Sequence, residues 1–262
     1  MFALVIGLAV VVAITTAVRS IWSPCGLSML ATITPMAEAG RGHSFRSTSV
    51  WFVLGSVAGG LTLGGLMAGI AFAAQRVGVD SYLALGIVSA ASLATSASDA
   101  RLGGFHLPGH DRQVNERWLD RYRSWVYGAG FGWQIGVGLA TYIMTGGVYL
   151  LVLTGGLSAD PVAALGLGAL FGLVRGLAVY LATGLDTTEK LHTFHARFEA
   201  MRDPVRQGTI VVQALVAISA ATAVSANAPM LGTVVALAAL TVAAGLRAPR
   251  EAVYLPDATP VN

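Results

Sequence analysis

Charged residues are scarce in this sequence. Asp, Glu, Lys and Arg make up 11% of the 262 residues, whereas soluble domains carry about 25%. Hydrophobic residues make up 55%. This composition excludes an ordinary soluble domain and predicts an all-α, polytopic integral membrane protein that contacts the lipid bilayer. The net charge of +3 is too small to indicate nucleic-acid binding.

Cysteine is almost absent as well. A single residue, Cys25, excludes a disulfide framework within the chain and says nothing about the compartment. The first ten residues, MFALVIGLAV, lack a basic residue, so we expect a retained membrane segment rather than a cleaved signal peptide. The string GAGFGWQIG is not a dinucleotide fingerprint, because no strand precedes it, and no cofactor is expected.

Long apolar runs follow one another along the chain. A membrane helix needs about 20 apolar residues. The uncharged runs cover 2–18, 20–37, 47–75, 81–98, 124–159, 161–185 (interrupted by Arg175) and 207–246, and the last is divided by Asn227-Ala228-Pro229 into 208–225 and 230–246. We expect seven crossings if 2–36 is one broken helix, and eight if Arg19 caps a tight hairpin. Many glycines at the start of run 124–159 favour a broken or flexible beginning there.

The basic residues predict which loops face the cytoplasm. Thirteen Lys and Arg residues lie in segments 37–47, 99–124 and 186–207 and in the C-terminal tail, whereas the alternate loops hold only Arg76. By the positive-inside rule, these segments and the tail at 249–262 face the cytoplasm. We therefore expect a multi-pass protein of the cell inner membrane with a cytoplasmic C-terminus.

Two parts of the sequence are weakly similar to each other. Residues 23–37 align with 135–149, so that Gly26 meets Gly138, and 54–65 align with 167–178. Three crossings separate the copies, which makes the second copy inverted, and inverted repeats with broken leading helices are typical of membrane transporters. We predict one transmembrane domain at 1–248, with repeat one at about 20–100, repeat two at about 125–225 and an extra helix at 230–246. The alternative is ordinary similarity among helices rich in Gly, Ala and Leu.

Ser23, Pro24 and Cys25, with Pro35 ten residues further on and a glycine-rich second helix, carry a family resemblance. Over about residues 20–225 the chain resembles the CcdA/DsbD thiol-disulfide transporters of the LysE-type superfamily. The resemblance implies two inverted three-helix repeats and a pair of cysteines that passes electrons from a thioredoxin-like protein, as in cytochrome c biogenesis.

The sequence departs from that family in two places. The family motif has a proline where Ser28 or Met29 stands, and Val137 occupies the position aligned with Cys25. Because valine cannot carry electrons, a complete two-thiol relay is excluded. The resemblance then implies that Cys25 exchanges with a thiol of a partner, either a thioredoxin-like protein, another membrane protein or a second copy of this chain in a homodimer.

The residues around Cys25 allow two interpretations. Pro24 favours the first turn of a helix, which places Cys25 near backbone N–H groups that stabilise a thiolate. Burial in an apolar environment has the opposite effect and makes a thiol inert, as a small packing residue.

Polar residues inside or beside the apolar runs are candidates for a substrate pathway. A mid-membrane arginine is costly and usually faces a cavity or a partner, and Arg175 is flanked by apolar residues on both sides. The candidates are Pro24, Arg175, Gln134, Arg19, Ser96 and Asp99. For Arg175 the alternative is a packed arginine satisfied by backbone carbonyls.

Two further groups of residues have mainly structural explanations. Six glycines, at 55, 59, 60, 64, 65 and 69, predict close packing of one helix against its neighbours. The pairs His106/His110 and His192/His195 are weak metal candidates, and for the second pair the alternative is a helix lying at the membrane interface.

Three functions therefore remain open. The first is a one-cysteine thiol-disulfide and electron-transfer protein. The second is a small-solute or ion exporter, and the third is a non-catalytic membrane subunit of a larger complex.

Overall fold

The structure is a bundle of long apolar helices. The computed structural model describes residues 1–109, 121–225 and 228–247. Within these ranges every regular element is an α- or 3-10 helix, and no β-strand occurs. Six helices are long and apolar enough to cross a membrane: Phe2–Trp22, Phe45–Val77, Ser81–Asp99, Pro161–Ala182, Thr188–Val224 and Pro229–Arg247. The predicted all-α, polytopic membrane architecture is confirmed.

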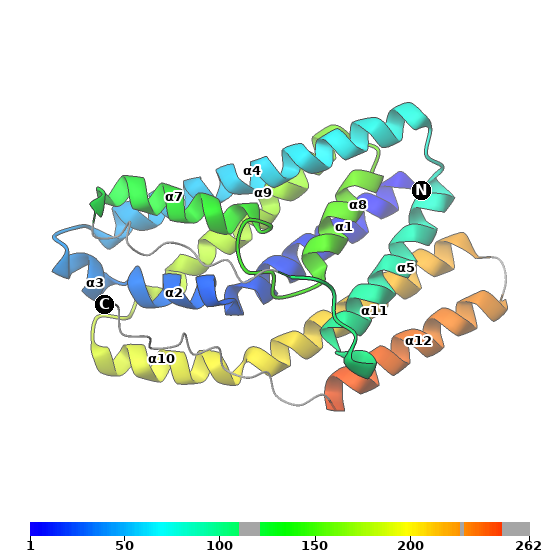
Figure 1. The fold of residues 1–262 in the computed structure, drawn as a ribbon. Helices are drawn as coiled ribbons and strands as arrows, with labels where there is room; N and C mark the ends of the chain where they lie inside the picture. Colours follow the sequence, from blue (N-terminus) through cyan, green and yellow to red (C-terminus); the bar gives the residue numbers. More distant parts are fainter. Residues whose placement is uncertain (110–120, 226–227, 248–262) are drawn as a thin grey trace.

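The elements run in a fixed order along the chain (Figure 1). They are α1 (Phe2–Arg19), η1 (Ser20–Trp22), α2 (Pro24–Thr32), α3 (Pro35–Gly40), α4 (Phe45–Val77), α5 (Ser81–Asp99), η2 (Leu102–Gly104), α7 (Ser124–Val137), α8 (Gly147–Leu157), α9 (Pro161–Leu177), η3 (Ala178–Ala182), α10 (Thr188–Ala200), α11 (Arg202–Val224) and α12 (Ala228–Arg247).

The chain does not turn back at Arg19. Helix α1 is followed by α2 and α3 in one continuing direction (Figure 1), so residues 2–36 form one broken crossing rather than a hairpin. The run 124–159 is also interrupted, because α7 and α8 are separated by residues 138–146. The glycine-rich beginning of that run is nevertheless helical, so the expected break lies after the glycines and not among them. With α7 and α8 counted as one crossing, the described helices correspond to the seven-crossing alternative.

Two helices, α5 and α9, each begin directly after an acidic residue that caps them. Asp80 precedes α5 and accepts hydrogen bonds from the backbone N–H groups of Tyr82 and Leu83. Asp160 precedes α9 and accepts from Val162 and Ala163 in the same way. Such N-caps satisfy donors that have no partner within the helix.

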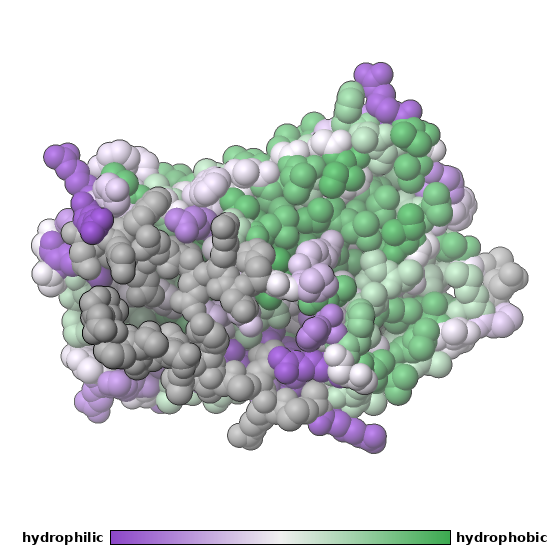
Figure 2. Space-filling view, viewed as in Figure 1, coloured by the Kyte–Doolittle hydropathy of each residue, from purple (hydrophilic) through white to green (hydrophobic). Residues whose placement is uncertain are grey.

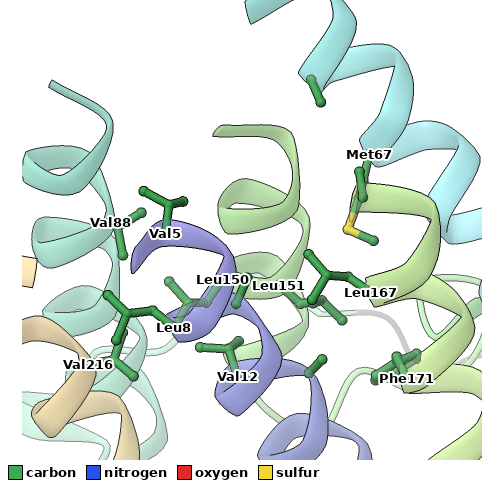
Figure 3. Close-up of a cluster of buried hydrophobic side chains, with 14 of the residues drawn as sticks. Val5, Leu8, Val12, Met67, Val88, Leu150, Leu151, Leu167, Phe171 and Val216 are labelled. Atoms are coloured by element: carbon green, nitrogen blue, oxygen red, sulfur yellow. The ribbon is translucent and has the colours of Figure 1, made fainter. Parts of the chain in front are cut away.

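Apolar side chains form both the interior and much of the surface. A buried cluster joins α1, α4, α5, α8, α9 and α11, and Figure 3 shows Val12, Leu151 and Leu167 near its centre. Outside it, the visible face carries a broad hydrophobic area over the helices (Figure 2). Exposed residues on α4 such as Leu54, Leu66 and Phe72 contribute to the apolar surface. An apolar surface of this kind suits a lipid environment.

Helix α4 packs against α7 on one side and against α9 on the other through glycine. A Cβ atom on Gly59 would lie 2.2 Å from the carbonyl oxygen of Trp133 in α7, and one on Gly60 would lie 2.2 Å from that of Gly168 in α9. Gly55 and Gly64 also have backbone of α7 or α9 within about 3 Å of the added atom. The predicted packing role is therefore confirmed for four of the six glycines.

The remaining two glycines of that group do not touch a neighbouring helix. A Cβ atom on Gly65 or Gly69 would meet nothing within 4 Å. For these two positions the packing prediction is wrong, because they lie on a face of α4 that no described helix covers.

The inverted repeat and the division of the chain into repeats stay predictions. The aligned segments 54–65 and 167–178 begin in α4 and α9, which pack as an antiparallel pair. The other aligned segments differ locally, since Cys25 lies in the first turn of α2 whereas Val137 is the last residue of α7. The tail at 249–262 lies outside the described residues, and the cytoplasmic side of the C-terminus also stays a prediction.

Candidate functional site

The first helix break arises from a serine and a proline. Helix α1 ends at Arg19 and continues as one 3-10 turn to Trp22. Ser23 is extended (φ −67°, ψ 156°), as expected for a residue before proline. Pro24 then begins α2, and the Ser23 hydroxyl accepts a hydrogen bond from the N–H of Gly26 at 3.3 Å. The prediction that Pro24 starts a half-helix with Cys25 in its first turn is confirmed.

The second break follows from a glycine. Gly138 ends α7 with φ +71° and ψ −39°, a conformation that L side chains rarely adopt. A Cβ atom there would also lie 2.8 Å from Cε1 of Phe171. Residues 139–146 then run outside regular helix until α8 begins at Gly147.

A charged cavity lies beside both breaks. Its volume is about 410 Å³. Its wall combines the end of α1, the end of α5, the segment 106–109, the segment 142–146 and the start of α11. Among the described residues, its lining includes the side chains of Arg19, Asp99, Arg101, His106 and Arg206. We call this cavity the arginine chamber.

Asp99 is the carboxylate of the chamber, and three groups donate hydrogen bonds to it. They are the hydroxyl of Thr145 at 2.5 Å, the N–H of Gly146 at 2.8 Å and the side-chain amide of Gln213 at 3.0 Å. Asp99 thereby ties the end of α5 to the second break and to α11. Arg19 is near enough to stabilise the carboxylate electrostatically.

The three arginines that line the chamber differ in exposure. Arg101 is exposed, whereas Arg19 and Arg206 are each only 2% exposed. Arg206 also forms an ion pair with Asp203, with 3.5 Å between Nη2 and Oδ1. Buried arginines of membrane proteins face cavities or partners, because the charge is costly to place in lipid.

Arg175 joins the two helix breaks. Its Nη1 donates to the carbonyl oxygen of Ile135 at 2.6 Å, and its Nη2 donates to that of Ser20 at 3.3 Å. The guanidinium also lies over the ring of Phe171, 5.6 Å from the centroid. Its acceptors are therefore backbone carbonyls, as the structural alternative predicts, and it does not line the arginine chamber.

The other predicted pathway residues lie apart from the chamber. The Ser96 hydroxyl oxygen lies 2.9 Å from the hydroxyl of Thr241 and 3.3 Å from the carbonyl oxygen of Ile210, so it ties α5 to α11 and α12. Gln134 is half-buried in α7, and Pro24 is half-buried at the start of α2. Of the six predicted pathway residues, the structure thus brings only Arg19 and Asp99 together in a cavity.

Cys25 lies in a second apolar cluster. It is 1% exposed and buried in the same cluster as Trp22, Met29, Phe52 and Phe131. The cluster is closed by α10, since Trp22 stacks on Phe198 at 4.2 Å and donates to its carbonyl oxygen at 2.8 Å. The apolar neighbours favour a packed, inert thiol. The buried guanidinium of Arg175 is near enough to interact electrostatically with Cys25 and acts in the opposite direction.

The pair His192/His195 belongs to no metal site in the part of the chain that the structure describes. Among the described residues, no group of three or more His, Cys, Asp or Glu side chains could hold a metal ion. His192 and His195 lie on α10, and His195 contacts the ring of Phe194. His106 lines the arginine chamber, while His110 lies outside the described residues.

Sequence analysis missed a buried polar network at the N-terminal end of α4. Glu38 is 0% exposed and accepts hydrogen bonds from Thr48, from Tyr127 at 2.6 Å and from Arg41 at 2.9 Å. His43 lies 3.3 Å from the Tyr127 hydroxyl. Glu38 precedes the start of α4 by seven residues. The one available signal in the sequence was that it is the single acidic residue of the basic segment 37–47.

Comparison with known proteins gives one group of relatives. The chain is 32% identical to the methylamine utilization protein MauF of Paracoccus versutus over 178 residues, which cover 68% of this chain and 64% of that protein. It is 30% identical to MauF of Methylophilus methylotrophus over 177 residues (66% and 61%) and 32% identical to MauF of Paracoccus denitrificans over 175 residues (64% and 60%). The chain thus spans less than two thirds of the length of these relatives. No family model and no solved structure matches it.

These findings overturn the resemblance to the CcdA/DsbD thiol-disulfide transporters. The matched relatives are MauF proteins, and no model of a thiol-disulfide transporter family matches the chain. The associated function, electron transfer for cytochrome c biogenesis through Cys25, is wrong as well. Its physical weakness is visible in the structure, because the thiol is packed among apolar side chains. A thioredoxin-like partner loses its basis with that function.

Proposed function

We propose that this chain is an accessory membrane protein of methylamine utilization, with the role that MauF has in the relatives. The observation that carries the proposal is the identity of about one third to MauF proteins over some two thirds of this chain. The apolar, polytopic helical bundle supports it, since it restricts the protein to work at or within a membrane.

The arginine chamber is the part of the protein that we assign to this work. It is polar, lies where two helices are broken, and combines residues from both halves of the chain. Non-helical backbone at membrane depth is tolerated only where protein buries it or where it lines a cavity. Arg19 and Asp99, both predicted from sequence, would therefore act together. We place the protein in the cell inner membrane with a cytoplasmic C-terminus, on the distribution of basic residues.

Gene deletion in the organism that encodes this chain tests the role. The deletion strain is expected to lose growth on methylamine while it still grows on a carbon and nitrogen source unrelated to methylamine. A plasmid copy of the intact chain should restore growth on methylamine. A copy with Arg19→Gln and Asp99→Asn should restore it poorly, with the protein level checked by immunoblot of membranes.

Two results would speak against this function. Normal growth of the deletion strain on methylamine removes the proposed role altogether. Full rescue by the double variant leaves the methylamine role intact but removes the assignment to the arginine chamber.

A further inference from the structure

We propose that His43 is a pH-sensitive latch, which in its protonated form holds the connection between α3 and α4 against α7. The inference goes beyond a role in methylamine utilization and does not depend on it. His43 lies between Gly40, where α3 ends, and Phe45, where α4 begins. Its ring nitrogen Nδ1 lies 3.3 Å from the hydroxyl oxygen of Tyr127, which stands in α7, 84 positions later in the sequence.

The direction of this hydrogen bond follows from the other partner of the tyrosine. The Tyr127 hydroxyl has one proton, and it donates that proton to Oε2 of Glu38 at 2.6 Å. Glu38 is fully buried and forms an ion pair with Arg41 at 2.9 Å, so it accepts as a carboxylate. Because the tyrosine proton is committed to Glu38, the Tyr127 oxygen accepts from His43. Nδ1 of His43 must therefore carry a proton.

Histidine meets this requirement in two ways that differ in strength. Neutral imidazole has one N–H, and in the tautomer with that proton on Nε2, two lone pairs face each other across the contact with Tyr127. Imidazolium has a proton on both nitrogens and always donates to Tyr127. Its positive charge also lies across the hydroxyl from the Glu38 carboxylate, and hydrogen bonds from an ionised donor are stronger than neutral ones. Protonation of His43 therefore strengthens the tie to α7.

The charged groups around His43 among the described residues come from all three elements that meet here. On α3, Glu38 favours the imidazolium. Arg41, two residues before His43, opposes it, but its charge is offset because it is already paired with Glu38. Arg46 at the start of α4 and Arg123 directly before α7 have exposed side chains, whose charges solvent and salt screen. Glu38 is thus the fully buried charge of this group, and it favours the protonated ring.

The network around Glu38 would remain in place when the latch opens. The backbone N–H of His43 donates to the carbonyl oxygen of Glu38 at 2.8 Å, and Gly42 before it has φ +72°, which glycine supplies in a turn. Thr48 of α4 donates to the Glu38 carboxylate independently of His43. Loss of the proton from His43 therefore weakens the hold of α7 on residues 41–44 alone.

The pH dependence of thermal stability tests the latch. The whole chain in phosphatidylcholine nanodiscs would be unfolded by heat at several values from about pH 5 to about pH 8, where histidine changes its charge. Because the contact with Tyr127 exists in the folded state alone, the latch stabilises the protein at low pH, and this contribution is lost as the pH rises. The matched control, His43→Gln, donates from its amide at every pH. We expect the Tm of the unmodified protein to fall relative to that of His43→Gln by about 2–4 °C across this range.

The difference between these two proteins isolates His43, since the other four histidines are present in both. Tyr127→Phe removes the acceptor of the latch. Tyr127→Phe and the double variant Tyr127→Phe/His43→Gln should therefore have parallel Tm profiles over the same pH range, even if both are less stable than the unmodified protein. If His43→Gln does not fold, His43→Ala takes its place. This variant has no donor at any pH, so the unmodified protein should exceed its Tm at low pH and lose that advantage as the pH rises.

Two results would overturn the inference. Parallel Tm profiles of the unmodified protein and the His43 variant would show that the charge of His43 has no effect on the folded state. A pH-dependent difference that persists in the Tyr127→Phe background would show that His43 acts through another partner and not as a latch on α7.

Discussion

Arg175 donates a hydrogen bond from Nη1 to the carbonyl oxygen of Ile135 at 2.6 Å. Through Nη2 the same side chain reaches the carbonyl of Ser20 at 3.3 Å. Each of these carbonyls also accepts one backbone hydrogen bond at 3.2 Å, that of Ile135 from the N–H of Gly138 and that of Ser20 from the N–H of Ser23. The guanidinium group therefore supplies a second donor to each carbonyl where its helix ends. One guanidinium therefore stabilises both helix breaks, although they are about 115 residues apart in the sequence.

Replacement of Arg175 by leucine is expected to lower the stability of the folded protein. The change removes two charge-assisted hydrogen bonds and leaves the carbonyls of Ser20 and Ile135 with their backbone donors alone, a loss of about 1–3 kcal/mol. Arg175→Lys should also be less stable, because a lysine ammonium group lacks the two separate nitrogen donors that reach Ser20 and Ile135. Thermal unfolding in detergent measures the stability of both variants. Arg197→Gln, an exposed position on α10, is the control, and an Arg175→Leu protein as stable as this control would contradict the bridging role.

Close packing of α4 on α9 gives a second prediction. Gly60→Ala should destabilise the protein by about 1–3 kcal/mol, because the new methyl group would lie 2.2 Å from the carbonyl of Gly168. Gly65→Ala, on the same helix, is the matched control, since nothing lies within 4 Å of the added atom. Alanine also favours helix over glycine, so Gly65→Ala should be neutral or slightly stabilising. Equal unfolding midpoints for the two variants would refute the packing argument.

Features that depend on neighbouring residues in the sequence could be predicted, whereas contacts between residues far apart in the sequence could not. Composition and apolar runs are local properties, and they predict the helices and the broken first crossing. Arg19 and Asp99 could be singled out one at a time, because each stands within or at the edge of an apolar run. Their proximity could not be predicted, since it depends on how α1, α5 and α8 pack.

The role of Arg206 and the conformation of the glycine-rich stretch of α7 could not be predicted for the same reason. Arg206 looked like one of several loop charges in 186–207, and only the packing of α11 places it in the chamber. The glycine-rich stretch of α7 looked like a break, but its glycines lie against the backbone of α4, so the stretch remains helical. In both cases the deciding partner is far away in the sequence.

The network around Glu38 provides the third prediction. Glu38→Ala should destabilise the protein by about 2–4 kcal/mol, because Arg41, Thr48 and Tyr127 lose a buried acceptor. Tyr127→Phe removes one of these donors. The double variant should cost less than the sum of the two single variants, by about 0.5–3 kcal/mol. Chemical unfolding of the unmodified protein, the two single variants and the double variant measures this coupling. Glu189→Ala, which changes an exposed residue of α10, is the control. Strict additivity would mean that the two side chains do not act as one network.

The fourth prediction concerns Cys25 and separates a packed thiol from an active one. Because the side chain is 1% exposed, a membrane-permeable maleimide should not label the folded protein and should label it fully after denaturation. Cys25→Ala should retain function in the methylamine growth assay, since a small apolar residue fills most of the same space. Its stability should fall by about 1 kcal/mol through the lost sulfur contacts.

Rapid labelling of the folded protein, together with loss of growth in Cys25→Ala at a normal protein level, would restore a chemical role for the thiol. Labelling that is slow in the folded protein but fast in Gly60→Ala would instead indicate that tight packing of α4 is what protects the sulfur.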